Sequence, residues 1–279
     1  MSTTLTGAWG RPVNTAANQK GGIHDDDTAT ELGFSGGTVA GSIHMEQFLP
    51  LLLQAFGDAW WHEGVISLYF MQATMDRQPV QCHLSFADEE STRATIWMEN
   101  EDGDTIMSGT ANLANCSEPT TLEERLADLR PPSELRVLKD FAVGQTVSSN
   151  AYVNLDSVER QLAVITESHE YFTDSGKFGQ PVLPYTAVVR ACNAVEQISG
   201  EPAIQPFVGL YGGIQISYLA GPVLAETDYQ ATCRVVGLSD SPKTEILWRE
   251  TELSKDGKPV ARMLKLDRLM KNSSPLWAE

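Results

Sequence analysis

The sequence of 279 residues predicts an α+β fold of two tandem units, each with one central helix followed by an antiparallel sheet. Two stretches read as copies of one another: GFSGGTVAGSIHMEQFLPLLLQAFG at 33–57 and KFGQPVLPYTAVVRACNAVEQISG at 177–200. Alternating apolar and polar segments follow each copy, and Gly-containing or charged turns separate them, as in a meander of strands. Because further matches keep the same order and similar spacing, we infer a duplication. These matches are Phe34 with Phe178, Tyr69-Phe70 with Tyr218-Leu219, and Asp102-Gly103 with Asp256-Gly257.

The first unit is predicted to occupy residues 1–114. Residues 1–20 read as irregular, and the three acids of HDDDTATEL suit the first turn of a short helix, where the backbone dipole favours negative charge. Apolar residues spaced from Val39 to Phe56 predict the central helix, and Pro50 predicts a kink or break within it. Strands are expected over VISLYFMQA, VQCHLSFAD, RATIWMEN and TIMSGTANL.

Residues 115–137 are polar and charged, and we interpret them as a linker with a short helix, LEERLADL, and a Pro-Pro stop. The second unit is then predicted to occupy residues 138–279. It begins with one or two strands between Phe141 and Val153, followed by a helix over DSVERQLAVITESHEYF and a second helix from Thr186 to Ile198. Strands are expected over FVGLYGGIQISYLA, DYQATCRVV, EILWRETELS and PVARMLKLDRLM.

Composition and charge indicate where in the cell the protein is expected and which partners are not expected. The net charge is −17, which repels nucleic acid and anionic membranes, so neither is expected as a partner. The four cysteines form no CxxC pair and read as reduced thiols. The N-terminus lacks the features of a signal peptide, and the longest apolar run is too short to span a bilayer. We therefore expect a cytoplasmic protein, either a monomer or a homodimer.

One segment, GGIHDDDTATELGFSGGTVAGSIHM, resembles the signature of the MaoC-like, (R)-specific enoyl-CoA hydratases. In that family an Ile/Leu-His-x-Asp element precedes a few helical residues, a Phe and a Gly-containing turn into the central helix. The corresponding residues here are Ile23-His24-Asp25-Asp26, Phe34 and Val39-Ala40-Gly41. The resemblance covers nearly the whole chain and implies a double hot-dog fold, in which each unit is a central helix wrapped by an antiparallel sheet.

The sequence departs from the family pattern at the catalytic acid. The family carries an Asp five residues before the His, where this chain has Gln19, and the family's His-Gly at the helix start is Ala40-Gly41 here. Gln19 can orient a water molecule through hydrogen bonds, but it cannot accept a proton as Asp does. A hydratase would therefore have to recruit another carboxylate, and Asp26 and Glu167 are the candidates.

The resemblance implies a hydro-lyase that adds or removes water across the α,β-bond of an acyl thioester or a related carbonyl compound. His24 would be the general base, because the unperturbed pKa of histidine, about 6.5, lies near cellular pH. The Gly41 amide, at a helix N-terminus, would hold the thioester oxygen. The predicted catalytic residues are His24, Gln19, Asp26 and Gly41, and the predicted substrate-binding residues are Ser42, His44, Tyr69 and His169.

Other motifs limit the chemistry further. The sequence contains no metal-ligand cluster, no GxSxG element and no phosphate-binding loop, so we expect no metal, no cofactor and no serine nucleophile. Pro184 has no N–H to offer at the second helix start, so the second unit is predicted to be a degenerate scaffold that walls the acyl pocket. A coenzyme A ester would need a local basic patch, for which the candidates are Lys20, Arg77, Arg93 and Arg190.

Three alternatives stay open at this point. The same pocket could isomerise, cyclise or dehydrate a substrate that is not a coenzyme A ester. A thioesterase would want a carboxylate on the central helix, where Glu46 is the only acid. A non-catalytic acyl-binding module would keep the fold without turnover, and fold alone does not decide between these functions.

Overall fold

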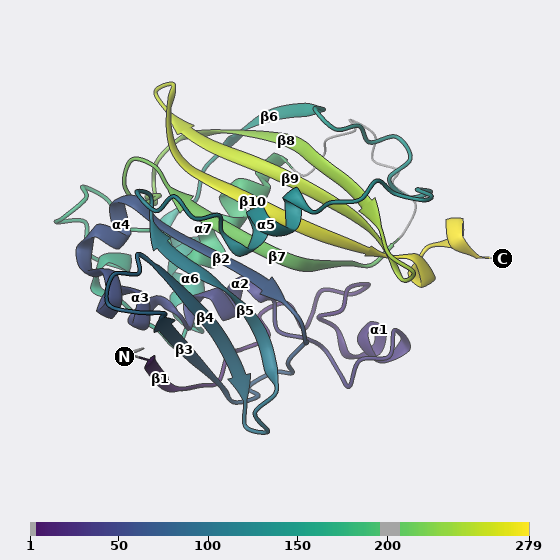
Figure 1. The fold of residues 1–279 in the computed structure, drawn as a ribbon, viewed down its shortest axis with the longest axis horizontal. Coiled ribbons are helices and arrows are strands. Elements are labelled where there is room, and N and C mark those ends of the chain that lie inside the picture. The colour runs from purple at the N-terminus through teal and green to yellow at the C-terminus, as the bar shows by residue number, and fades with distance from the viewer. Residues whose placement is uncertain (1–3, 196–206, 279) are drawn as a thin grey trace.

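A single ten-stranded antiparallel sheet forms the frame of the protein (Figure 1). The computed structural model describes residues 4–195 and 207–278. Strand order is β1-β3-β4-β5-β2-β7-β10-β9-β8-β6. The strands are β1 (Thr4–Gly10), β2 (Gly64–Phe70), β3 (Val80–Phe86), β4 (Arg93–Asn100), β5 (Thr105–Leu113), β6 (Thr146–Ala151), β7 (Gly209–Tyr218), β8 (Tyr229–Asp240), β9 (Thr244–Lys255) and β10 (Lys258–Met270).

The two halves of this order mirror one another about the β2–β7 pair. Strands β1 to β5 form one half-sheet and β6 to β10 form the other, with the same internal order outward from the centre. β2 and β7 run antiparallel, and Ser67 lies opposite Gln215 at the middle of the pair. Each half-sheet wraps its own central helix, so the fold is the predicted double hot-dog.

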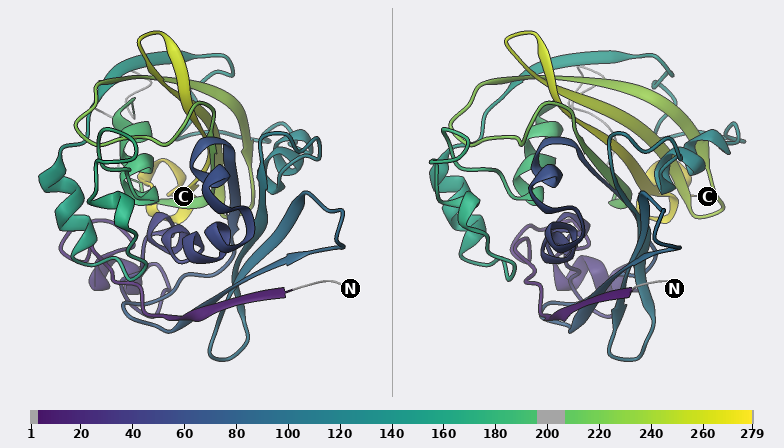
Figure 2. Two further views of the ribbon diagram at one scale, coloured as in Figure 1. Left: turned by 90° about the vertical axis from the view of Figure 1, so that its left-hand side faces the viewer. Right: turned by 60° about the vertical axis from the view of Figure 1, so that its left-hand side comes forward.

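The helices lie on the concave side of the sheet, except for α5 (Figures 1 and 2). α5 lies on the opposite, outer face, within the segment that the sequence predicts to be a linker. The helices are α1 (Asp26–Glu31), α2 (Gly41–Glu46), α3 (Leu49–Phe56), α4 (Trp60–Glu63), α5 (Thr121–Ala127), α6 (Leu155–Leu162) and α7 (Tyr185–Cys192).

The first central helix is interrupted, as Pro50 predicts. α2 ends at Glu46, and α3 begins at Leu49 with Pro50 in its first turn. Proline is tolerated there because the first-turn N–H groups of a helix have no intrahelical acceptor. The proline therefore divides the predicted helix into two short helices.

Three predicted elements differ from the structure. Residues 4–10 form β1 instead of an irregular segment, because β3 supplies a partner ladder. α6 ends at Leu162, where the amides of Val164 and Ile165 both bond to the Gln161 carbonyl and tighten the last turn. The β-branched residues that follow also disfavour helix. α7 ends at Cys192, and the predicted continuation to residue 198 lies partly outside the described residues.

The main core lies between the sheet and the central helices. Phe48, Leu52 and Trp60 from the first unit pack in one cluster with Val188 and Ile214 from the second. The Trp60 indole N–H also donates to the Tyr185 hydroxyl at 2.8 Å. Burial of apolar side chains from both units in one cluster joins the units into one body.

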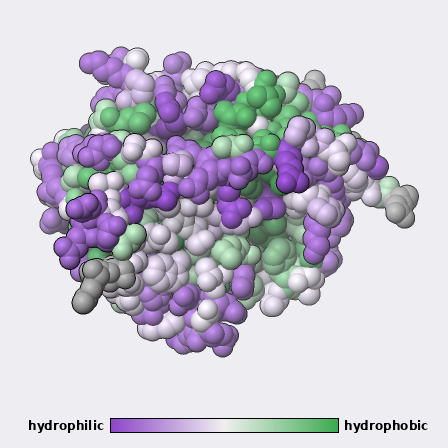
Figure 3. Space-filling model, viewed as in Figure 1, coloured by the Kyte–Doolittle hydropathy of each residue, from purple (hydrophilic) through white to green (hydrophobic). Residues whose placement is uncertain are grey.

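The outer face of the sheet carries a smaller cluster beneath α5. Leu122 of α5 packs there with Trp248 of β9 and Leu266 of β10. Seen from this side, the surface is mostly hydrophilic, with an apolar area toward its upper edge (Figure 3). None of the described helices is long and apolar enough to cross a membrane.

One hairpin turn has the same backbone conformation in both units. Gly103, between β4 and β5, has φ of 80°, and Gly257, between β9 and β10, has φ of 74°. Glycine adopts this left-handed conformation without steric cost. The two predicted copies of Asp-Gly therefore perform the same task in equivalent turns.

Candidate functional site

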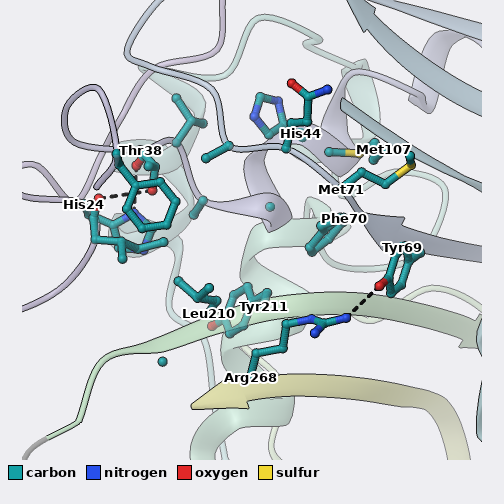
Figure 4. A pocket seen from close by; sticks show the side chains of 18 residues that line it. His24, Thr38, His44, Tyr69, Phe70, Met71, Met107, Leu210, Tyr211 and Arg268 are labelled. Atoms are coloured by element: carbon teal, nitrogen blue, oxygen red, sulfur yellow. Dashed lines mark hydrogen bonds between the residues drawn. The ribbon is translucent and has the colours of Figure 1, made fainter. Parts of the chain in front are cut away.

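A cavity of about 550 Å³ lies where β2 and β7 part. Their pairing ends at Tyr69 opposite Gly213, while β7 extends back to Gly209. The cavity lining therefore includes side chains from both faces of the sheet (Figure 4). The lining residues are Ile23, His24, Phe34, Thr38, Val39, Ala40, Gly41, His44, Tyr69, Phe70, Met71, Gln72, Ala73, Met107, Gly209, Leu210, Tyr211 and Arg268.

His24 lines this cavity, and its hydrogen bond defines its tautomer. Its Nδ1 lies 2.8 Å from the Thr38 carbonyl oxygen (Figure 4). A carbonyl oxygen only accepts, so Nδ1 carries the proton, and Nε2 of the neutral ring keeps its lone pair. The half-buried ring is thus oriented as a proton acceptor.

The loop behind His24 is held by backbone contacts. The Asn14 side-chain amide donates to the His24 carbonyl at 2.8 Å, and the Thr38 amide donates to the Ile23 carbonyl at 2.8 Å. A Cβ on Gly37 would approach the His24 carbonyl oxygen to 2.3 Å, so only glycine fits there. The GG turn of the motif thereby sets the distance between the His24 loop and the start of α2.

Gly41 begins α2 in the same cavity. As the first residue of the helix, it has no intrahelical acceptor for its amide. The Phe70 ring covers its Cα, and a Cβ there would lie 2.3 Å from Phe70 Cε2. Glycine at this position is therefore required by the packing of Phe70.

His44 lies one turn further along α2 and is held neutral. Its ring is almost fully buried, and its Nε2 is 2.6 Å from the Thr74 hydroxyl. Burial lowers the pKa of His44 to about 4, because the charged ring would lose its hydration. His44 lines the cavity as a neutral polar group.

The outer side of the cavity is cationic. Arg268 of β10 donates to the Tyr69 hydroxyl at 2.6 Å (Figure 4), and the Arg125 guanidinium of α5 stacks 3.5 Å from the centre of the Tyr69 ring. Arg268 is the only cation among the described residues of the lining. The cavity therefore presents positive charge in a chain whose net charge is −17.

The structure brings together only some of the predicted site residues. His24, Gly41, His44 and Tyr69 share the cavity described above. Gln19 and Ser42 instead line a second cavity of about 610 Å³ beside α7. The two cavities share one lining residue, Tyr211.

Asp26 and His169 also lie outside the lining of the first cavity. The Asp26 carboxylate accepts the Gly37 amide at 2.7 Å and supports the loop. His169 packs against the rings of Trp61 and Tyr171, and its Nδ1 accepts the Tyr171 amide at 3.2 Å. His169 thus belongs to an aromatic cluster that contains residues of both units.

Another acid of the motif, Asp25, has a structural role. It is almost fully buried, and it accepts hydrogen bonds from the Thr28 hydroxyl and amide at the start of α1. These hydrogen bonds hold the pKa of Asp25 well below its ordinary value, and the bond from the Thr28 hydroxyl has the largest effect. The motif therefore uses this carboxylate as a helix cap.

Among the described residues of the lining, none is Asp or Glu. Glu167 bonds to Gln47 and Thr166. Glu46 is fully buried, and its carboxyl accepts the Thr186 amide at 2.7 Å at the start of α7. Glu46 thereby occupies the helix start of the second unit, and it does not line the cavity as a thioesterase would require.

The four basic residues expected from the sequence do not form a patch. Lys20 pairs with Asp25 and Asp27, Arg77 with Asp76, and Arg93 with Glu118 and Glu124. Arg190 bonds to Ser157 and lines the second cavity. Arg268 instead provides the positive charge in the lining of the first cavity, and Arg125 stacks on the lining residue Tyr69.

Sequence patterns did not single out Arg268 or Tyr211. Arg268 meets Tyr69 across 199 positions of sequence, and Tyr211 depends on an irregularity in β7. The sequence did contain one related signal. The match of Tyr69-Phe70 with Tyr218-Leu219 identifies β2 and β7 as equivalent strands of the two units.

The fold is similar to those of several solved structures. A MaoC domain protein dehydratase of Chloroflexus aurantiacus has a TM-score of 0.67 and 11% identity, over 97% of this chain and 95% of that chain. A MaoC-like dehydratase has a TM-score of 0.60 and 10% identity, over 96% and 97%. A conserved hypothetical protein of Mycobacterium tuberculosis with a double hotdog fold has a TM-score of 0.58 and 10% identity, over 96% of each chain.

These similarities establish the double hot-dog fold over nearly the whole chain. The sequence matches no protein-family model and no curated protein.

Proposed function

We propose that this double hot-dog protein adds or removes water across the α,β-bond of an acyl thioester in the cavity at the β2–β7 seam. The observation that carries the proposal is that His24 and Gly41 both line this cavity. One supplies an oriented imidazole and the other a helix-start amide. These are the base and the oxyanion donor that the reaction needs.

In the dehydration direction, His24 removes the proton on the α-carbon. Because Nδ1 donates to the Thr38 carbonyl, Nε2 is the atom that receives this proton. The same bond stabilises the imidazolium that forms, since Nδ1–H becomes a stronger donor when the ring is charged. Hydration is the reverse of this step.

The Gly41 amide serves the thioester carbonyl. Negative charge develops on that oxygen as the α-proton leaves, and an N–H at a helix start stabilises it in a site of low dielectric. Phe70 covers Gly41 and supplies an apolar surface beside this oxygen. The amide is thus a fixed donor that needs no rearrangement during the reaction.

Charge at the outer side of the cavity supports an anionic substrate. Arg268 and Arg125 flank Tyr69 there. A thioester of a phosphate-bearing carrier would otherwise be repelled by the acidic chain. Arg268 in the lining and Arg125 on the Tyr69 ring offset this repulsion.

The test follows the absorbance of a crotonyl-type thioester with the wild type, His24→Ala and His62→Ala. Loss of a general base typically lowers the rate roughly 10²–10⁴-fold, and we expect such a loss for His24→Ala. His62 is exposed in α4 and lines neither cavity, so its variant should keep the wild-type rate. Equal rates for His24→Ala and the wild type would remove His24 from the mechanism.

A second candidate function uses the same base without hydration. The described lining contains no carboxylate to hold a water molecule, which favours a single-base isomerisation, cyclisation or dehydration of a different carbonyl compound. A chromatographic survey of thioesters and free acids separates the two functions. Turnover of an enolisable free acid, with none of a thioester, would replace the first proposal by the second.

A further inference from the structure

Tyr211 faces the cavity because β7 contains a bulge. Leu266 lies opposite Gly213 and Asp267 lies opposite Tyr211, so Gly212 is an extra residue in β7. In a regular strand Tyr211 would share a face with Gly213, which packs under Leu122 of α5. The bulge turns Tyr211 to the helix side, where it lines the cavity with His24 and Gly41.

Glycine at 212 is what permits this irregularity. A Cβ there would lie 2.1 Å from Leu266 Cδ2 and 2.9 Å from Arg268 Nε. The neighbouring strand therefore leaves no room for a larger residue. Both the bulge in β7 and the close approach of β10 therefore depend on glycine at position 212.

A polar network holds the Tyr211 hydroxyl. The Asn193 side-chain N–H donates to that hydroxyl at 3.1 Å, and Lys265 donates to the Asn193 oxygen at 2.8 Å. Because an ammonium only donates, the Asn193 amide can be oriented in only one way. The Tyr211 oxygen therefore accepts a hydrogen bond at a fixed position.

Positive charge also lies beside the phenol. Lys265 is almost fully buried, and its Nζ is 4.7 Å from the centre of the Tyr211 ring. Lys265 is 3.3 Å from Asp267, which also binds Arg249 at 2.6 Å. The Lys265 ammonium therefore lies near the Tyr211 ring at a cation–π distance and contributes a buried positive charge beside the phenol.

We propose that Tyr211 is the catalytic proton donor to the leaving hydroxyl in the dehydration, with His24 as the base. This inference rests on the proposed function. The described lining holds no Asp or Glu, and Tyr211 is the acidic hydroxyl on the helix side of the cavity. Asn193 and Lys265 are its positioning residues.

The step balances without any further reactant. His24 Nε2 takes the α-proton, and the C–H electron pair forms the α,β double bond. The bond from the β-carbon to oxygen breaks, and that oxygen takes the Tyr211 proton and leaves as water. The proton on the His24 imidazolium then returns through solvent to the Tyr211 phenolate, which restores both residues.

A change of leaving group tests this role. We compare a β-hydroxyacyl thioester with the matching β-chloroacyl thioester, because chloride leaves without a proton. Tyr211→Phe should lower kcat roughly 10²–10⁴-fold for the hydroxy substrate and leave it unchanged for the chloro substrate. His24→Ala should lower both, since both reactions need the α-proton removed.

Tyr152→Phe is the matched control. Tyr152 is about half exposed and bonds to Glu226, and it does not line the cavity of His24, so its variant should keep both rates. Circular dichroism establishes that each variant is folded. An unchanged hydroxy rate in Tyr211→Phe, or equal losses on both substrates, would overturn the donor role alone. No turnover of either substrate by the wild type would overturn the proposed function as well.

Discussion

Glu46 offers a test of how the two units are joined. Its buried carboxyl accepts the Thr186 amide at the start of α7, and its second oxygen has no hydrogen-bond partner among the described residues. Burial raises the pKa of Glu46 to about 8 because the charged carboxylate would lose its hydration. Glu46→Gln keeps an acceptor for the Thr186 amide and removes the titration.

The sign of the effect follows from proton binding. Between pH 4.5 and about 8 the folded protein holds a proton on Glu46 that the unfolded chain has released, so the free energy of unfolding falls as pH rises through this window. Each pH unit between the two pKa values is worth about 1.4 kcal/mol. The loss is therefore on the order of 5 kcal/mol at most in the wild type, and it is absent in Glu46→Gln.

The assay is urea unfolding of both proteins at about pH 5 and about pH 9. The wild type should lose several kcal/mol relative to Glu46→Gln at the higher pH. Glu89→Gln, at an exposed position between β3 and β4, should show no such difference from the wild type. Parallel pH dependence of the wild type and Glu46→Gln would refute the reasoning, because it would mean that Glu46 releases its proton equally in both states.

Two further predictions concern the cavity. Gly41→Ala places a methyl group against Phe70 and should cost about 1–3 kcal/mol of stability, whereas Gly22→Ala, which meets nothing within 4 Å, should be nearly neutral. The Gly41→Ala cost should be smaller in a Phe70→Ala background, and strict additivity in urea unfolding would contradict the contact. Arg268→Gln should lower kcat/KM roughly 10- to 100-fold for a coenzyme A thioester, and little for the uncharged N-acetylcysteamine thioester. Equal losses on the two would assign Arg268 to the fold instead of the substrate.

Much of the fold could be predicted because its signals are local. The alternation of β2 to β5 and β7 to β10, the Asp-Gly turns and the acids that open α1 each depend on a few neighbouring residues. Pro50 marked the division of the first central helix for the same reason. β1 was missed because its short alternation becomes a strand only when β3 lies beside it.

The candidate site was predicted in part. His24 and Gly41 line the same cavity, and the close approach of Gly37 to the His24 carbonyl oxygen fixes the segment that connects them. Gln19 is only five residues before His24, yet the intervening turn directs it to the second cavity. His169 matched His24 in spacing, but it packs among aromatic rings and does not line the cavity of His24.

The amino-acid sequence by itself determined the two-unit plan, the strand and turn pattern, and the loop that carries His24 to the start of α2, because each follows from interactions between residues close in the chain. Only the tertiary structure decided that Arg268 meets Tyr69, that Glu46 covers the second helix start, and that a bulge at Gly212 turns Tyr211 toward the cavity. These features depend on the register of strands and the packing of helices far apart in sequence, where the displacement of a single residue exchanges one face of a sheet for the other.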